Sequence, residues 1–169
     1  MVLKTVHELV DLYKLERHPE GGFFKETYRS EGKIEGSLLP EGMSGSRSFA
    51  TAIYFLIPEE NKSCLHRILS DEIWHFYIGG SLTLVQIFQD GRLETTVLGA
   101  DLDSGQKLQH VVPAGCWFGA YANSGAPYAF VGCTVSPGFD FLDFEMGERE
   151  HLIETYPHLA STIVQFTNE

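Results

Sequence analysis

The feature that most constrains the fold of this chain is a succession of short strand-like runs between residues 47 and 135. Turn residues separate the runs: Asp90 and Gly91, a pair that favours a tight hairpin, lie between two of them, and Pro58 ends another. No helical pattern interrupts the series, so it predicts an antiparallel sandwich or barrel. The runs cover residues 48–57, 65–69, 72–78, 82–88, 92–98, 109–112, 116–121 and 128–135.

Helical patterns are confined to the two ends of the chain. Thr5 and Glu8 have the spacing of a capping box, and apolar residues follow at helical intervals. We expect a short helix that ends before Pro19, because the residue preceding a proline disfavours the α conformation. The other expected segments are a strand at 20–29, a loop at 30–46, and helix at about 148–156 and after Pro157.

Length and composition predict one globular domain over residues 1–169. The formal net charge of -11 argues against a nucleic acid or an anionic membrane as partner, because both require a basic surface. Solubility alone explains this acidity, and a preference for cationic ligands is the sharper alternative.

The three cysteines show no metal-binding or redox spacing, and each lies in an apolar run. They are therefore expected to be small buried residues in a reducing compartment. The first residues lack a secretory signal pattern, and no apolar run approaches the roughly 20 residues that span a bilayer. These observations predict a cytoplasmic protein.

Alternation of side chains along a strand orients the candidate site residues. If Glu72 points into the barrel, Trp74 and Phe76 point inward with it, and His75 points outward. Glu72 and His75 therefore share a metal ion only if the strand bulges between them. His66, on the preceding run, is expected to face the same interior as Glu72.

His66, Glu72, Gly79 and the later Pro113-x-Gly115 turn resemble the motif pattern of the cupin superfamily of β-barrels. In its common form that pattern carries four metal ligands, three histidines and one glutamate. Here only His66 and Glu72 stand at such positions, while Ile68 and Phe118 occupy two others. Two protein ligands hold a first-row metal weakly. We therefore expect no metal cofactor beyond weak or adventitious divalent ions.

The sequence also resembles one cupin family more closely, the uncharacterised cupin_5 family, also called DUF985. The resemblance implies a jelly-roll barrel, a double-stranded β-helix with short helices at both ends, and a homodimer. It implies no established reaction. The resembling segments are residues 18–29, 51–56, 70–77, 112–118 and 134–140.

In architecture the chain is similar to the metal-free cupin epimerases that act on dTDP-4-keto-6-deoxyglucose. Those enzymes use a histidine base and a tyrosine acid, and their first strand, which crosses to the partner subunit, carries a run similar to residues 22–26. Their Arg-Gly-x-His element is missing here, and the chain has only 12 Lys and Arg residues for a diphosphate. The similarity supports carbohydrate-like chemistry without identifying a nucleotide sugar.

The sequence thus predicts a cupin that binds a small polar or sugar-like carbonyl metabolite and transfers a proton on it, as an epimerase or isomerase does. His66 is the expected base and Glu72 its acid or orienting group, since burial and a neighbouring imidazolium shift a carboxyl pKa in opposite directions. One alternative is a non-catalytic metabolite-binding cupin. Another is a metal-dependent dioxygenase or isomerase, in which His75 or His110 joins His66. The residues expected to border the ligand are Trp74, Phe76, Phe118, Tyr121 and Tyr128.

Overall fold

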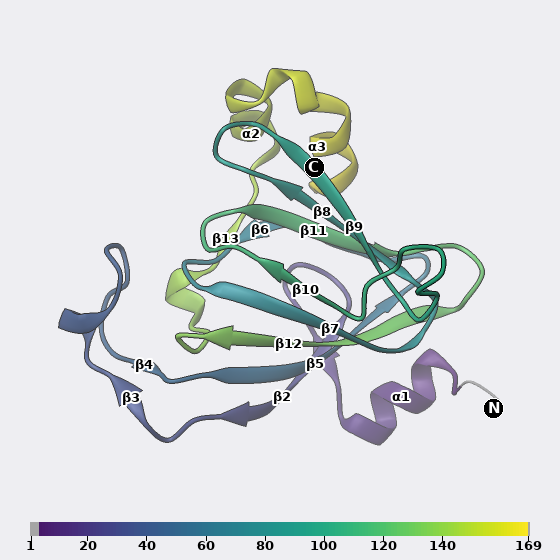
Figure 1. Cartoon of the computed structure of the whole chain (residues 1–169), viewed down its shortest axis with the longest axis horizontal. Coiled ribbons are helices and arrows are strands. Elements are labelled where there is room, and N and C mark those ends of the chain that lie inside the picture. The colour runs from purple at the N-terminus through teal and green to yellow at the C-terminus, as the bar shows by residue number, and fades with distance from the viewer. Residues whose placement is uncertain (1–3, 169) are drawn as a thin grey trace.

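Two antiparallel sheets face each other in the computed structural model, which describes residues 4–168 (Figure 1). The larger sheet has six strands in the order β1-β2-β5-β12-β7-β10, and every pairing within it is antiparallel. Their bounds are β1 (Glu16–Arg17), β2 (Phe23–Arg29), β5 (Thr51–Pro58), β12 (Tyr128–Ser136), β7 (Asp71–Gly79) and β10 (Gln109–Val112).

The second sheet has five strands in the order β13-β6-β11-β8-β9. It contains the hairpin predicted at Asp90 and Gly91, which joins β8 to β9. A separate two-stranded ribbon pairs β3 with β4. The bounds are β13 (Glu145–Met146), β6 (Lys62–Arg67), β11 (Trp117–Ala122), β8 (Leu82–Ile87), β9 (Leu93–Leu98), β3 (Lys33–Ile34) and β4 (Arg47–Ser48).

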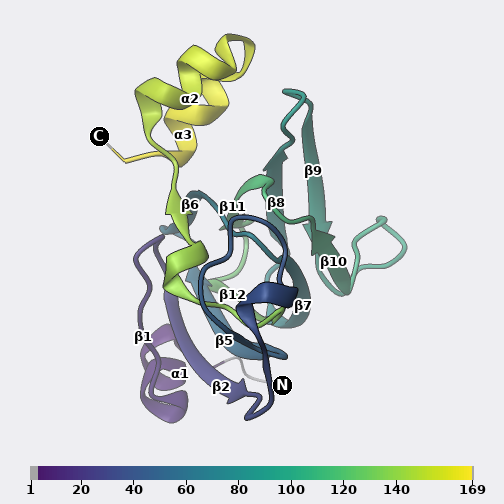
Figure 2. The ribbon, with the colours of Figure 1, turned by 90° about the vertical axis from the view of Figure 1, so that its left-hand side faces the viewer.

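Helices lie at the two ends of the chain, as the sequence predicts. The expected capping box is present: the Glu8 amide donates to the Thr5 hydroxyl, and the Glu8 carboxylate accepts from the Thr5 amide. Figure 2 shows α1 and the α2–α3 pair on opposite sides of the sandwich. The helices are α1 (Val6–Tyr13), α2 (Arg149–Thr155) and α3 (Ala160–Phe166), and the 3-10 turns are η1 (Gly36–Leu38), η2 (Phe141–Asp143) and η3 (Pro157–Leu159).

The long strands were predicted correctly, with local differences. The short strands β1 and β13 were not expected, and the strand expected at 20–29 begins at Phe23, because the chain turns at residues 19–22. The run at 48–57 is divided into β4 and β5, because the chain turns at Phe49 and Ala50. The expected loop at 30–46 contains β3 and η1, because Lys33 and Ile34 pair with β4, at the beginning of that divided run. The predicted jelly-roll fold with short terminal helices is confirmed.

Three apolar clusters hold these layers together. The central cluster fills the space between the sheets and includes Phe55, Trp74 and Phe118. A second cluster packs α2 and α3 against the outer face of the five-stranded sheet, and a third packs α1 against β5 and β12. All three cysteines are free and buried, as predicted. Among the described residues, no helix is long and apolar enough to cross a membrane.

Candidate functional site

A cavity of about 240 Å³ opens between the sheets at one end of the sandwich. Its walls follow strand alternation, because β5 contributes every second residue from Thr51 to Phe55 and β12 contributes Cys133 and Val135. The lining residues are His18, Glu20, Phe24, Glu26, Arg29, Thr51, Ile53, Phe55, His66, Ile68, Glu72, Cys133, Val135, Phe139, Asp140, Phe141 and Phe144.

The inner part of the cavity holds a buried ion pair between His66 and Glu20. His66 Nε2 lies 3.0 Å from Glu20 Oε2, and His18 Nδ1 lies 3.2 Å from the same oxygen. The other carboxylate oxygen of Glu20 accepts a hydrogen bond of 2.8 Å from the Ser63 hydroxyl. The remaining ring nitrogen of His66, Nδ1, lies 2.7 Å from the Cys64 carbonyl oxygen.

These contacts define the protonation state of His66. A carbonyl oxygen only accepts hydrogen bonds, so Nδ1 carries a proton, and an ionised Glu20 requires a second proton on Nε2. Burial alone would lower the pKa of His66, but the charge and hydrogen bond of Glu20 raise it overall. Burial would raise the pKa of Glu20, yet His66 and His18 hold it well below its usual range. Both ring nitrogens of His66 thus have acceptor partners, as an imidazolium requires.

Glu72 lines the same cavity but has a different electrostatic environment. Its side chain is only 8% exposed, and it forms no ion pair within residues 4–168. Burial raises its pKa to about 7; His66 opposes this shift and Glu20 adds to it. The thiol of Cys133 lies beside it, and burial together with Glu72 keeps the pKa of that thiol well above its usual value. Near neutral pH, Glu72 thus exchanges a proton while Glu20 stays ionised.

Glu20 and His18 are site residues that the sequence reasoning missed. They lie in the turn before β2, which bends at Gly21 and Gly22 with φ angles of +116° and +70°. A Cβ on Gly21 would collide with the carbonyl oxygen of Lys62, so this close approach requires glycine. A backbone hydrogen bond of 2.8 Å from the Cys64 amide to the Glu20 carbonyl joins the turn to β6. The signal available in the sequence was an acidic residue, Glu20, followed directly by two glycines that favour a turn.

Three aromatic residues expected to border the ligand lie on inward-facing strand positions outside the cavity lining. Trp74 points inward, but it packs in the closed core against Phe55, at 5.7 Å between ring centroids, and does not line the cavity. Phe118 lies behind the His66 imidazole, with 4.1 Å between ring centroids. Phe76 packs against the same central cluster. The aromatic walls are instead formed by Phe24, Phe55, Phe139, Phe141 and Phe144.

The two tyrosines predicted to border the ligand also lie elsewhere. Tyr121 packs against Phe166 of α3, on the outer face of the five-stranded sheet. Tyr128 is buried in the cluster beneath α1. Tyrosine is missing from the cavity lining in the described part of the chain, so these phenols are not candidates for an acid at this cavity.

The histidines of the metal-dependent alternative do not approach His66. His75 faces away from the cavity, where its ring bonds to Thr134 and Gln109, and the register of β7 is regular from Glu72 to His75. His110 contacts Gln86. His66 has no free nitrogen lone pair, and no set of three or more His, Cys, Asp or Glu side chains within residues 4–168 is arranged to hold a metal ion. These donors do not fit the four-ligand cupin centre.

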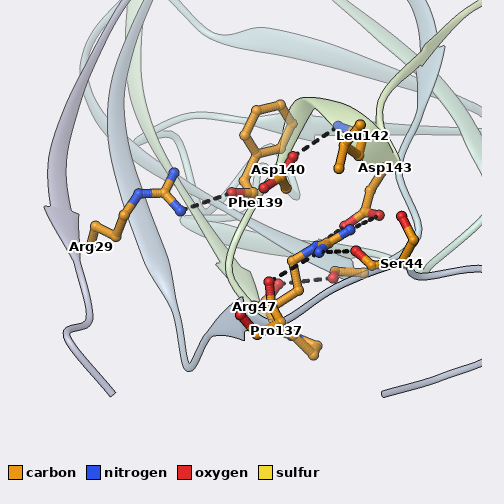
Figure 3. A network of polar contacts seen from close by, with 10 residues as sticks. Arg29, Ser44, Arg47, Pro137, Phe139, Asp140, Leu142 and Asp143 are labelled. Atoms are coloured by element: carbon orange, nitrogen blue, oxygen red, sulfur yellow. Dashed lines mark hydrogen bonds and ion pairs between the residues drawn. The ribbon is translucent and has the colours of Figure 1, made fainter. Parts of the chain in front are cut away.

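The mouth of the cavity is built by β2 and by the segment between β12 and β13. On β2, Arg29 forms a bidentate pair with Glu26, at 3.0 and 2.7 Å, and donates to the Phe139 carbonyl at 3.1 Å. A second bidentate pair lies just behind: Arg47 donates two hydrogen bonds of 2.7 Å to the buried Asp143 (Figure 3). Arg47 also donates to backbone carbonyls of residues 44 and 46, so it joins η2 to the loop before β4.

The folded barrel and its interior cavity define a member of the cupin superfamily. The chain belongs to the Cupin_5 family, described as Cupin superfamily (DUF985), whose profile matches residues 7–147. A similar curated protein is the uncharacterized protein YML079W of Saccharomyces cerevisiae, which is 31% identical over 88% of this chain and 80% of its own length.

Solved structures support the same assignment. Protein SO0799 from Shewanella oneidensis has a TM-score of 0.88 and 37% identity, with 98% of this chain and 99% of that chain covered. A hypothetical protein from Leishmania major has a TM-score of 0.91 and 35% identity, over 98% and 100%. The Bacillus subtilis oxalate decarboxylase OxdC, at 14% identity, a TM-score of 0.54 and coverage of 89% and 37%, shares the fold alone.

Proposed function

We propose that the cavity binds a small polar carbonyl metabolite and that Glu72 transfers a proton on it without a metal, as an isomerase or epimerase does. The observation that carries this proposal is the buried Glu72 carboxyl group, which faces the cavity without an ion-pair partner and has a pKa of about 7. A general base is most effective when its pKa lies near the working pH.

The chemistry assigns different roles to Glu72 and His66. The Glu72 carboxylate takes a proton from the carbon beside the carbonyl group. The C–H electron pair forms a carbon–carbon double bond, the carbonyl π electrons move to oxygen, and the substrate becomes an enolate. The positive charge of His66 stabilises the developing anion electrostatically. Glu72, now protonated, returns the proton to carbon. The base role expected for His66 moves to Glu72, because both His66 nitrogens already hold protons.

Solvent exchange tests this proposal. A panel of small hydroxycarbonyl compounds is incubated with the protein in D₂O, and proton NMR follows loss of the signal from the carbon beside the carbonyl. Glu72→Gln should abolish the exchange, because an amide cannot accept the proton. Glu154→Gln, the same change on the exposed face of α2, should leave it intact. Equal exchange by Glu72→Gln and the unmodified protein would refute proton transfer by Glu72.

A non-catalytic metabolite-binding protein is the second candidate. The lack of a tyrosine hydroxyl among the described lining residues supports it, because an epimerase of the kind similar in architecture uses one as its acid. A compound that binds in the cavity and never exchanges its protons would favour this candidate.

We also propose that two copies of the chain associate through β2. Strand β1 pairs only with Phe23 and Phe24, so residues 25–29 have no neighbouring strand on that side within the described chain. Tyr28 on this segment is 54% exposed. An open strand edge is a template for pairing with another chain. Sedimentation velocity measures the association, and a monomer at all concentrations would contradict it.

A further inference from the structure

The charges that line the cavity do not balance. Four carboxylates contribute to it, and two of them are paired, Glu20 with His66 and His18, and Glu26 with Arg29. Glu72 and Asp140 form no ion pair within residues 4–168. The basic side chains of the lining thus pair with Glu20 and Glu26, which leaves the lining with excess negative charge from Glu72 and Asp140.

Glu72 is the buried member of this surplus. The groups that face it are His66 from β6, Glu20 and His18 from the turn before β2, and the Cys133 thiol from β12. The two imidazoles among these groups both contact Glu20: His66 binds Glu20 and the Cys64 carbonyl through its two ring nitrogens, and His18 binds Glu20 through Nδ1. An ionised carboxylate this deeply buried is costly unless a partner balances it. A positively charged partner can therefore reach the Glu72 carboxylate only from the open space of the cavity.

The aromatic walls favour the same sign of charge. Phe139, Phe141 and Phe144 form one cluster, with ring centroids between 5.0 and 6.1 Å apart, and Phe24 and Phe55 complete the walls. The face of an aromatic ring carries negative potential and attracts cations, most strongly where water is excluded. The volume of about 240 Å³ is below the roughly 300 Å³ at which drug-sized pockets begin, so the occupant is small.

We infer that the cavity takes a small organic cation, an amine-bearing metabolite whose ammonium group pairs with Glu72 and packs against the phenylalanine walls. This inference rests on the proposed use of the cavity as a small-molecule site and names the class of its ligand. The ammonium group supplies the charge partner that Glu72 lacks. An anionic ligand would instead meet Glu72, Asp140 and the aromatic faces together.

Three probes of equal ring size test the inference: cyclohexylammonium, cyclohexanol and cyclohexanecarboxylate. An alkylammonium, like a lysine side chain, stays charged up to about pH 10, so its charge is constant near neutral pH. Titrations at pH 8 followed by protein NMR give each dissociation constant, and shifts at Thr51, Ile53 and Val135 locate the binding in the cavity.

We expect cyclohexylammonium to bind about tenfold tighter than cyclohexanol, and cyclohexanecarboxylate to bind more weakly than either. Glu72→Gln should reduce ammonium binding to the level of the alcohol, whereas Glu154→Gln should not change it. Equal or tighter binding of the alcohol or carboxylate, shifts outside the cavity, or no binding of any probe would overturn the inference. The comparison of probes uses the unmodified protein, so it stands even if Glu72→Gln does not fold.

The two proposals fail separately. An ammonium preference without proton exchange on any carbonyl compound would remove the proton transfer and leave the ligand class intact. Proton exchange on neutral carbonyl compounds, with no preference for the ammonium probe, would do the reverse.

Discussion

Two buried ion pairs serve the cavity, and they differ in whether their charge can be removed. At the mouth, Arg47 and Asp143 form a bidentate pair that binds η2 to the loop before β4 (Figure 3). On the inner side, Glu20 and His66 are joined by one contact of 3.0 Å. Arginine keeps its proton at all accessible pH values, whereas histidine can lose one. The Arg47–Asp143 pair therefore keeps its charges and holds the wall of the cavity in place. The Glu20–His66 pair loses its positive charge when His66 releases a proton.

The largest effect is expected at the fixed pair. Asp143→Asn removes the carboxylate and leaves the Arg47 guanidinium buried without a counter-charge. Breaking such a pair costs about 3–5 kcal/mol. Urea unfolding at pH 7 measures the loss.

Asp103→Asn is the matched control, because Asp103 is exposed, and it should change the unfolding free energy by no more than about 0.5 kcal/mol. If both variants lose equally little, the Arg47–Asp143 pair does not fix the wall of the cavity.

The next effect is expected at Glu72. Its pKa rises from 4.5 to about 7 on folding, so the folded protein holds a proton that the unfolded chain has released, and stability falls as the pH rises between these values. Glu72→Gln should remove this loss, with a gain of the order of 3 kcal/mol at pH 8 and no gain near pH 4. Denaturation at a series of pH values measures it. A gain that is independent of pH would show that packing, rather than ionisation, is responsible.

A smaller effect is expected for Glu20→Gln. His66 can respond by losing a proton, so at pH 8 the cost should be about 1–3 kcal/mol, below that of Asp143→Asn. The cost should grow as the pH falls, because protonation of the unfolded chain then competes with a neutral buried His66. Nitrogen-15 NMR of the imidazole near pH 6.5 should show two ring protons in the unmodified protein and one in the variant. Two protons in both would contradict the role of Glu20 as the counter-ion.

The sequence was sufficient for the fold and for half of the polar site. Period-two alternation and turn residues located every strand of the two large sheets except β1 and β13. The same alternation placed His66 and Glu72 toward one interior, and both line the cavity. Alternation says which face a residue occupies, but not whether that part of the interior is open or filled. For this reason Trp74 was assigned to the cavity although it lies in the packed core.

The remaining site residues come from segments outside the strand pattern. Glu20 was placed at the start of an expected strand, but it lies in the turn before β2 and reaches His66, more than forty residues later in the chain. Phe139, Phe141 and Phe144 follow the last strand that the sequence predicted, in a segment without a regular pattern. Contacts of this kind depend on how distant segments meet in the folded chain, and local sequence does not encode that meeting.

The cavity is enclosed on one side by residues 18–29 and on the other by residues 139–144, which belong to opposite ends of the barrel sequence. A molecule that touches both segments therefore fastens β2 to η2, the 3-10 turn that follows β12. Occupancy should then slow amide hydrogen exchange in β2 and protect this edge from proteases, because neither segment could detach while the other was held.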